Sequence, residues 1–258
     1  MGRLVHRVDP RDGTDAPLVT PSDVGAAVPR AGGGLVLCLR DGLHLQDGDG
    51  DPVPWIALPH GPSVRCNDAK ADASGRLYAG TMAYDAAPEA GALYRVDPGA
   101  TRAAVVVPAV TISNGLAWSA DGRTLWYIDS PLRRIDAFDV DPASGALSGR
   151  RTAVDLSAVA GVPDGMTIDA DGGLWVAFFG GACVKRFDPA TGACDVTIPI
   201  PARDVTSCAF GGPDLADLFV TTARIACDDA ELAARPLSGA LFRVRPGVRG
   251  LPVDRVAA

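Results

Sequence analysis

The sequence predicts an all-β protein, a six-bladed β-propeller whose first blade lacks its N-terminal inner strands. The main observation is a unit that recurs about every 42 to 49 residues: a polar turn ending in Gly or Asp, then Leu and a short apolar run. Repeats of this length with short strands and Gly-rich turns are typical of stacked four-stranded blades. A second observation is that helical patterning is almost absent. The recurring segments are 33–36, 75–78, 122–126, 172–175 and 217–219.

Each unit predicts its strands in a fixed order. A first strand, as in 115–118, leads through an Asp-Gly or Gly-Gly turn to a second strand, as in 125–128. A third strand alternates apolar and polar residues over 134–139 and ends at a turn that contains Pro and Gly. The same third strand and turn recur over 184–192, and in part over 92–98 and 240–244. Helical composition is confined to 228–235, which we expect to form a short turn or lid in a loop.

The segment 4–13 already matches the third strand and its turn, so the sequence begins in the middle of a unit. We expect one propeller domain over residues 1–258, with 1–24 as a partial first blade and 25–258 as five further blades. The partial blade would leave strand edges without a partner. One explanation is that this chain is a truncated version of a longer protein.

Composition excludes several classes of partner. The chain has 24 Lys and Arg against 31 Asp and Glu, a net charge of −7, which argues against nucleic-acid or anionic membrane surfaces. No apolar stretch approaches the roughly 20 residues of a membrane span, and the first residues lack a signal-peptide core, so we expect a cytoplasmic protein acting on a small molecule. The pattern does not indicate an oligomeric state. The six cysteines lack close paired spacing, which favours reduced thiols over zinc ligands or disulfides.

Three equivalent positions in successive units carry side-chain oxygens: Asn67, Asn114 and Asp164. Because a propeller brings equivalent residues of its blades to one axis, we expect these side chains to converge there. Amide and carboxylate oxygens suit Ca²⁺, and also Zn²⁺ or Mn²⁺ if water completes the coordination shell. A single Asn-Gly or Asp-Gly is more often a turn, but three positions in register favour one site for a divalent metal ion.

Four segments carry a resemblance to a known family: 65–70 with 79–82, 112–116, 163–166 and 206–212. Together they resemble the gluconolactonases and regucalcin, which are calcium- or zinc-dependent six-bladed propellers that hydrolyse sugar lactones. The resemblance implies that Asn114 and Asp164 are metal ligands and that Asn67 contacts the metal region or the substrate. It also implies that the metal polarises the lactone carbonyl while Asp164 acts as general base toward the attacking water.

The resemblance further implies substrate contacts. Arg65 resembles the family's substrate-binding arginine, whose planar donors suit sugar hydroxyls. Direct register places Asp85 where the family has an acidic residue, commonly Glu, on the loop after Gly-Thr-Met, and Glu89 is a second candidate on that loop.

The sequence departs from the family at one metal ligand. The family has a glutamate in a Gly-Glu-Gly segment upstream of the part that matches 4–10, and this sequence has no such segment. Fewer anionic ligands should weaken cation binding. The sequence therefore predicts hydrolysis of a sugar lactone to the aldonic acid, with three alternatives: a non-catalytic calcium- or sugar-binding propeller, an inactive truncated family member, or another hydrolase on the same fold.

Overall fold

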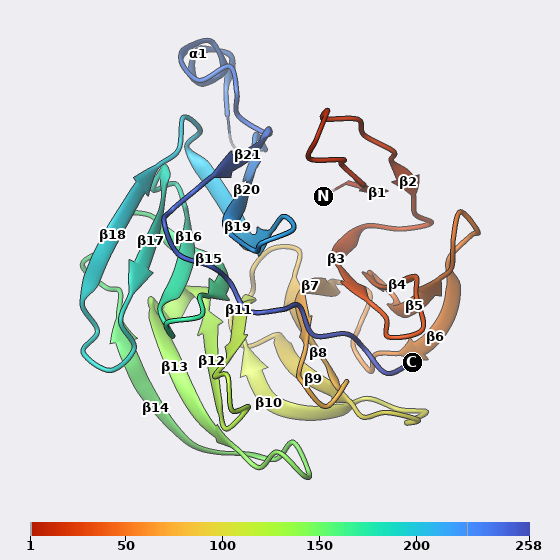
Figure 1. Ribbon diagram of the computed structural model, residues 1–258. Helices are drawn as coiled ribbons and strands as arrows, with labels where there is room; N and C mark the ends of the chain where they lie inside the picture. Colours follow the sequence, from red (N-terminus) through yellow and green to blue (C-terminus); the bar gives the residue numbers. More distant parts are fainter. Residues whose placement is uncertain (1, 226) are drawn as a thin grey trace. The chain divides into compact units, whose positions relative to one another are not determined.

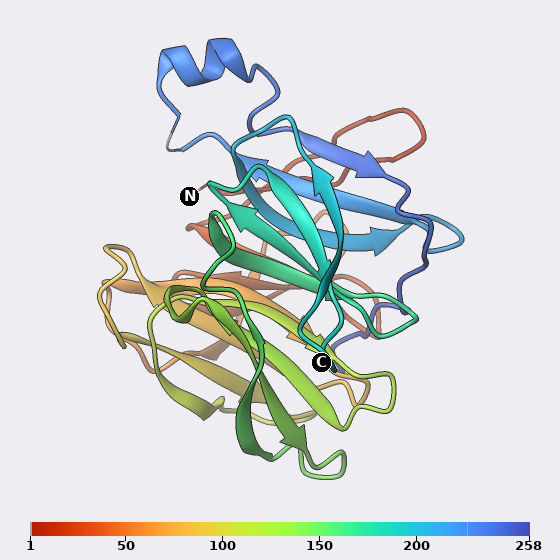
Figure 2. The ribbon, with the colours of Figure 1, turned by 90° about the vertical axis from the view of Figure 1, so that its left-hand side faces the viewer.

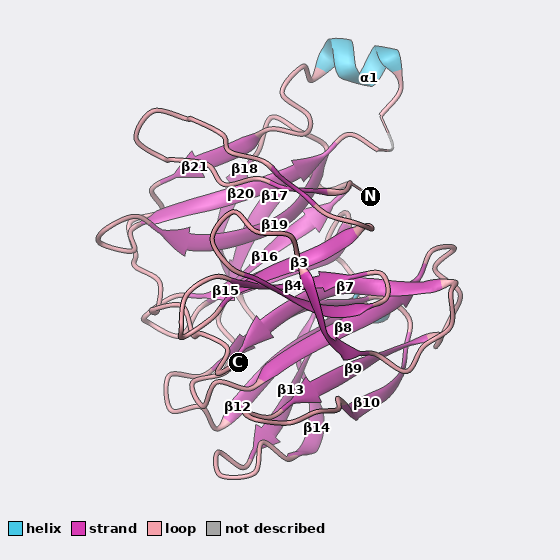
Figure 3. Cartoon of the chain, turned by 90° about the vertical axis from the view of Figure 1, so that its right-hand side faces the viewer, coloured by secondary structure: helices cyan, strands magenta, loops and turns pink. Residues whose placement is uncertain are grey.

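The computed structural model describes residues 2–225 and 227–258, and antiparallel strands make up most of its regular structure (Figure 1, Figure 3). The helical elements among the described residues are a short 3-10 turn, η1 (Ser130–Leu132), and α1 (Asp229–Ala234). Asp228 caps α1 by accepting a hydrogen bond from the Glu231 N–H, and the helix stands at the tip of a loop that extends beyond β20 and β21 (Figure 2). This confirms the predicted helical turn. Neither helical element has the length and apolar character that a membrane span requires.

Among the described residues, five sheets of three or four strands follow one another along the chain, and in each the neighbouring strands are consecutive in sequence. Their strands are β3 (Val24–Pro29), β4 (Leu35–Leu39), β5 (Gly42–Gln46) and β6 (Val53–Ala57); β7 (Val64–Ala71), β8 (Leu77–Ala83), β9 (Gly91–Val96) and β10 (Ala104–Val110); β11 (Ser113–Trp118), β12 (Thr124–Asp129), β13 (Arg134–Val140) and β14 (Leu147–Asp155); β15 (Val162–Ile168), β16 (Leu174–Phe179), β17 (Cys183–Phe187) and β18 (Cys194–Pro199); and β19 (Asp204–Gly211), β20 (Asp217–Ala223) and β21 (Leu241–Val244).

These up-and-down sheets confirm the predicted all-β propeller class. The strands expected at 115–118, 125–128 and 134–139 lie within β11, β12 and β13. The six-blade count is not confirmed, because the described residues form five sheets of blade size. In the segment expected to form the partial first blade, β1 (Leu4–Val5) and β2 (Leu18–Val19) pair only as a two-stranded ribbon. Such short strands bury too little surface to make a blade-sized sheet of their own.

The chain forms two compact units, one containing the residues up to Ser113 together with Val253–Ala258, the other Asn114–Pro252. The core of the first unit packs the sheet that begins with β3 against the sheet that begins with β7, around buried residues such as Leu43, Leu77 and Tyr94. The C-terminal segment joins these two sheets, because the Val256 N–H donates to Pro29 and the Ala257 N–H to Gly75. In the second unit, Phe178 and Trp175 lie in separate apolar clusters on either side of the sheet of β15–β18. The prediction of a single domain stays a prediction.

The recurring polar turn has a backbone explanation. Gly33, Gly75, Gly122 and Gly172 end these turns with φ of 95°, 80°, 68° and 87°, in the left-handed region that favours glycine. Each donates its N–H to the carbonyl three residues earlier. In the fifth sheet Leu215 takes this place with φ of 54°. The Gly in the sequence repeat therefore marks the turn between the first two strands of a sheet.

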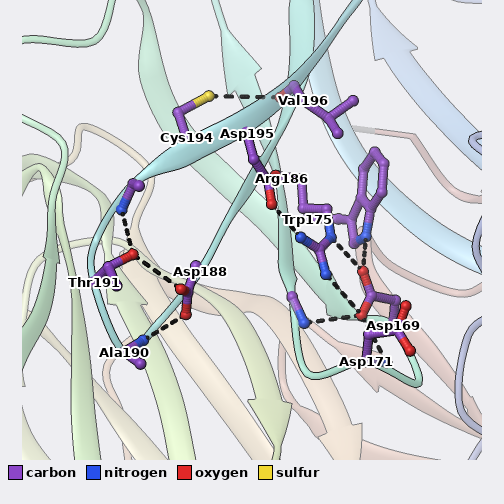
Figure 4. Close-up of polar contacts among 12 residues, drawn as sticks. Asp169, Asp171, Trp175, Arg186, Asp188, Ala190, Thr191, Cys194, Asp195 and Val196 are labelled. Atoms are coloured by element: carbon purple, nitrogen blue, oxygen red, sulfur yellow. Dashed lines mark hydrogen bonds and ion pairs between the residues drawn. The ribbon is translucent and has the colours of Figure 1, made fainter.

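A fully buried carboxylate holds one of these turns (Figure 4). Asp169 Oδ1 accepts from the N–H groups of Asp171 at 3.0 Å and Gly173 at 2.8 Å. Its Oδ2 accepts from Trp175 Nε1 at 2.7 Å and Arg186 Nε at 2.6 Å. Burial raises the pKa of this carboxyl, but the hydrogen bonds from Arg186, Trp175 and Gly173 and the guanidinium charge outweigh burial and hold the pKa below its usual value. Asp169 thereby joins the turn, β16 and β17.

We predict that Asp169→Asn destabilises the protein by about 3 kcal/mol at pH 7, because it leaves the mostly buried Arg186 charge without its main partner and turns an amide NH₂ toward other donors. Because the pKa of Asp169 is lower in the folded protein than in the unfolded chain, its carboxylate stabilises the fold fully at pH values above the unfolded-state pKa. This stabilisation is lost as the pH falls through the folded-state pKa. The difference in the free energy of unfolding between the wild-type protein and Asp169→Asn should therefore be largest near neutral pH and become smaller below about pH 4. Denaturant unfolding over this pH range measures it, with the exposed-site variant Asp171→Asn as control. A gap that did not change with pH would contradict the assignment.

Candidate functional site

Two predicted site residues, Asn67 and Asp164, lie at equivalent irregularities in the first strands of their sheets. The first strand of each sheet is called its inner strand. Between two paired positions, the inner strand of each of these sheets has one residue more than its partner strand, which is a β-bulge. A bulge re-aims a side chain out of the regular alternation, so it can present a polar group where a continuous strand would not. The pairs that flank the bulges are Cys66–Thr81 and Ala69–Ala79 for Asn67, and Pro163–Phe178 and Met166–Val176 for Asp164.

Glycine follows both candidate ligands of the second unit because the next inner strand lies very close. A Cβ on Gly115, after Asn114, would lie 2.6 Å from the Met166 Cβ and 2.9 Å from the Asp164 carbonyl oxygen. A Cβ on Gly165, after Asp164, would lie 2.2 Å from the Ser207 Oγ. Asn114-Gly115 and Asp164-Gly165 are therefore parts of strands β11 and β15, and not turns.

One buried hydroxyl connects Asn114 to the segment that carries Asp164. The Ser130 Oγ donates to the Pro163 carbonyl oxygen at 2.7 Å and accepts from the Asn114 Nδ2 at 2.7 Å. Ser130 is the first residue of η1 and is 1% exposed. The structure thus joins the predicted ligand Asn114 and the residue directly before Asp164 through a single side chain.

In the first unit, the structure brings Arg65 and Asn67 together. Arg65 Nη1 donates to the Asn67 Oδ1 at 2.8 Å and to the Cys66 carbonyl oxygen at 2.9 Å. The guanidinium also lies over the Tyr84 ring, 5.7 Å from its centroid. Asn67 Nδ2 donates to the carbonyl oxygen of Ser113, the residue before Asn114. A cation on the same Asn67 oxygen would be repelled by the guanidinium, so this arrangement favours a role in holding Arg65, and the predicted metal contact of Asn67 stays a prediction.

Asp85 lies in the exposed loop after β8, where its Oδ1 accepts from the Ala87 N–H at 3.1 Å. The same loop carries two left-handed residues, Ala86 and Glu89, and the Glu89 N–H donates to the Thr111 Oγ1 at 3.1 Å. The substrate-binding roles of Asp85 and Glu89 stay predictions.

Ionisable groups beside Asn67 have shifted pKa values. A hydrogen bond with the Cys38 thiol, together with His60 and Arg65, lowers the pKa of the Cys66 thiol to about 7, although burial opposes the shift. Burial raises the pKa of the Asp68 carboxyl, and nearby Lys70 only partly offsets this. The six cysteines are free thiols in the structure.

Among residues 2–225 and 227–258, no group of three or more His, Cys, Asp or Glu side chains is arranged to hold a metal ion. Any metal held by the predicted residues would therefore rely on amide oxygens and water beside the single carboxylate of Asp164.

Sequence reasoning assigned no role to Ser130 or Tyr84. The Ser-Pro step at 130–131 after a predicted strand signals the start of a helical turn. Nothing local indicates that the hydroxyl reaches residues 16 positions before and 33 positions after it in sequence.

Comparisons with known proteins show which family this chain resembles. A family model described as "SMP-30/Gluconolactonase/LRE-like region" matches residues 1–224. Regucalcin of Danio rerio is 42% identical over 235 residues, which span 89% of this chain and 79% of that protein. A Bacillus subtilis protein, YvrE, whose name provisionally describes it as a sugar lactone lactonase, is 35% identical over 244 residues, 94% of this chain and 83% of its own. A solved structure described as a calcium-binding protein, regucalcin, from Agrobacterium tumefaciens superposes with a TM-score of 0.93 at 28% identity, covering 99% of this chain and 86% of that one.

The close approach of β15 and β19 leads to a stability prediction. Gly165→Ala should destabilise the protein by about 1–3 kcal/mol, because the new methyl group meets Ser207 at 2.2 Å and has no room to move. Gly32→Ala is the matched control, since its Cβ would meet nothing within 4 Å. Denaturant midpoints of the two variants measure the difference. Equal midpoints for Gly165→Ala and Gly32→Ala would contradict this prediction, because they would mean that β15 and β19 can move apart without loss of stability.

Proposed function

The chain belongs to the SMP-30/gluconolactonase/LRE-like family, and we propose that it hydrolyses a sugar lactone to the corresponding aldonic acid with the help of a divalent metal ion. The observation that carries this proposal is the hydrogen-bonded connection from Asn114 through Ser130 to the main chain directly before Asp164. Through this connection Ser130 holds both the Asn114 amide on β11 and the main chain beside the Asp164 carboxylate on β15. The names of the relatives, a sugar lactone lactonase and a calcium-binding protein, support the substrate class and the metal.

The donor set fits a hard cation. We propose that the Asn114 Oδ1 and the Asp164 carboxylate hold the ion and that water fills its remaining positions, with Ca²⁺ preferred and Zn²⁺ or Mn²⁺ as other candidates. When bound, such an ion polarises the lactone carbonyl and stabilises the negative charge that develops on its oxygen. The predicted place of Asn67 in the same shell rests on the sequence alone.

Asp164 has the chemistry that the proton transfers need. In our proposal its carboxylate takes a proton from water as the water oxygen bonds to the lactone carbonyl carbon. The ring C–O bond then breaks, and the proton passes to the leaving alkoxide, so that lactone and water give one hydroxy acid. The bulge and the hydrogen bond from Ser130 to the Pro163 carbonyl oxygen constrain the main chain that carries this carboxylate.

Arg65 is the proposed substrate contact of the first unit. Its guanidinium is held by Asn67, the Cys66 carbonyl oxygen and the Tyr84 ring, so its planar donors have a fixed direction. A fixed fork of donors suits the paired hydroxyl oxygens of a sugar. Arg65→Lys would keep the charge and lose this geometry.

A calcium-binding protein without catalysis is the second candidate, favoured by the description of the Agrobacterium relative as calcium-binding. Isothermal calorimetry with Ca²⁺, run beside an assay of acid release from a panel of aldonolactones, separates the two. Binding of Ca²⁺ without turnover of any lactone in the panel would favour the second candidate.

We predict that Asp164→Asn lowers lactone hydrolysis by at least about 100-fold, because the amide can neither accept the proton nor supply the ligand charge. Acid release from D-glucono-1,5-lactone, corrected for spontaneous hydrolysis, measures the rate. Asp171→Asn, on the exposed turn of the same sheet, should retain the wild-type rate. An Asp164→Asn protein that kept the wild-type rate would remove Asp164 from the mechanism.

A further inference from the structure

Ser130 occupies a fixed position between two strands. It begins η1, which is closed by the Arg133 N–H donating to the Ser130 carbonyl oxygen at 3.1 Å, with Arg133 in the left-handed region. The Arg133 guanidinium donates to the carbonyl oxygens of Val159 and, at 2.8 Å, Gly161, in the segment that enters β15. Hydrogen bonds from Ser130 at the start of η1 and from Arg133 directly after it therefore attach this turn to residues 159–163. The Ser130 hydroxyl has little freedom to move.

The direction of each hydrogen bond at Ser130 follows from the groups involved. A carbonyl oxygen can only accept, so the single hydroxyl proton of Ser130 must point to the Pro163 oxygen. The Ser130 Oγ can then only accept from Asn114, and the branch of the Asn114 amide that faces it must be the NH₂ group. The oxygen of Asn114 must lie on the other branch. The Pro163 carbonyl oxygen thus fixes the direction of the Ser130 hydroxyl, and this hydroxyl fixes the orientation of the Asn114 amide.

We propose that Ser130 is the positioning residue of the cation site, which turns the Asn114 amide so that its oxygen, and not its nitrogen, is presented to the bound ion. This inference rests on the proposed function, because it assumes that Asn114 is a ligand. An amide nitrogen carries two protons and repels a cation, so a flipped Asn114 removes a ligand and adds an unfavourable dipole. Ser130 also fixes the carbonyl before Asp164, which couples the orientation of one ligand to the backbone of the other.

The first test is Ca²⁺ affinity of the purified, EDTA-treated protein, measured by calorimetry. Ser130→Ala should weaken Ca²⁺ binding by about 10- to 100-fold, the usual effect of removing a group that orients a ligand. Ser119→Ala is the matched control, because the Ser119 hydroxyl also lies in a polar network of the same sheet, accepting from the Thr124 N–H and donating to Asp121. Its Ca²⁺ affinity should stay within about twofold of wild type, as expected for an independent site.

A second variant separates orientation from general support of the fold. In Asn114→Asp both branches of the side chain are oxygens, so no orienting group is needed. Ser130→Ala should therefore weaken Ca²⁺ binding in the wild-type background. In the Asn114→Asp background it should change the Ca²⁺ affinity by no more than about twofold. A purely structural role for Ser130 predicts the same loss in both backgrounds. Unfolding midpoints in EDTA report any change in fold stability independently of the ion.

The outcomes are distinct. Loss of affinity in Ser130→Ala that disappears in the Asn114→Asp background supports the proposal. Equal affinity of wild type and Ser130→Ala, or an equal loss in both backgrounds, overturns it and leaves the proposed function standing. Absence of Ca²⁺ binding by the wild-type protein, with lactone hydrolysis that survives EDTA, overturns both the positioning role and the metal-assisted function.

Discussion

The close approach of consecutive inner strands is the constraint on which the candidate site depends. Gly115 and Gly165 have no side chain because a Cβ on either would overlap the neighbouring strand, at 2.6 Å and 2.2 Å from its nearest atoms. This spacing lets a side chain as short as Ser130 reach from Asn114 to the carbonyl oxygen of Pro163. In the first unit a Cβ on Gly25 would meet the Cys66 carbonyl oxygen at 2.5 Å, so the same constraint acts where Asn67 lies. Backbone packing and the polar site are therefore not independent features.

The outer strands and turns supply the rigidity that the inner strands need. Asp169 ties a turn to the two strands that follow it, and Asp72 repeats part of this arrangement, accepting from the N–H groups of Ser74 and Arg76. Such buried, fully bonded carboxylates specify the turn strongly, because their removal leaves several donors unsatisfied. Two of the predicted site residues, Asn67 and Asp164, lie in bulges, where the regular strand pairing is interrupted. At these two positions the bulge turns a polar side chain out of the regular alternation of the strand.

The sequence predicts the strands well because they depend on local alternation and on glycine at turns such as Gly122 and Gly172, which need a positive φ. It also singles out Asn114 and Asp164, since they stand at equivalent places in the repeat. It does not reveal the bulges, because these are properties of pairing between strands. Nor does it reveal Ser130, whose partners are distant in sequence. The predicted blade count exceeds the five blade-sized sheets, because a matching third-strand pattern does not supply the partners that a full sheet needs.

In our proposal, Asn114 and Asp164 bind one divalent cation, and the amide oxygen of Asn114 is directed to it. A crystal structure of the protein grown with Ca²⁺, with the ion located by anomalous scattering at long wavelength, tests this most directly. We expect one Ca²⁺ at about 2.3–2.6 Å from both the Asn114 Oδ1 and an Asp164 carboxylate oxygen. Anomalous density elsewhere, with no ion shared by these two side chains, would contradict it.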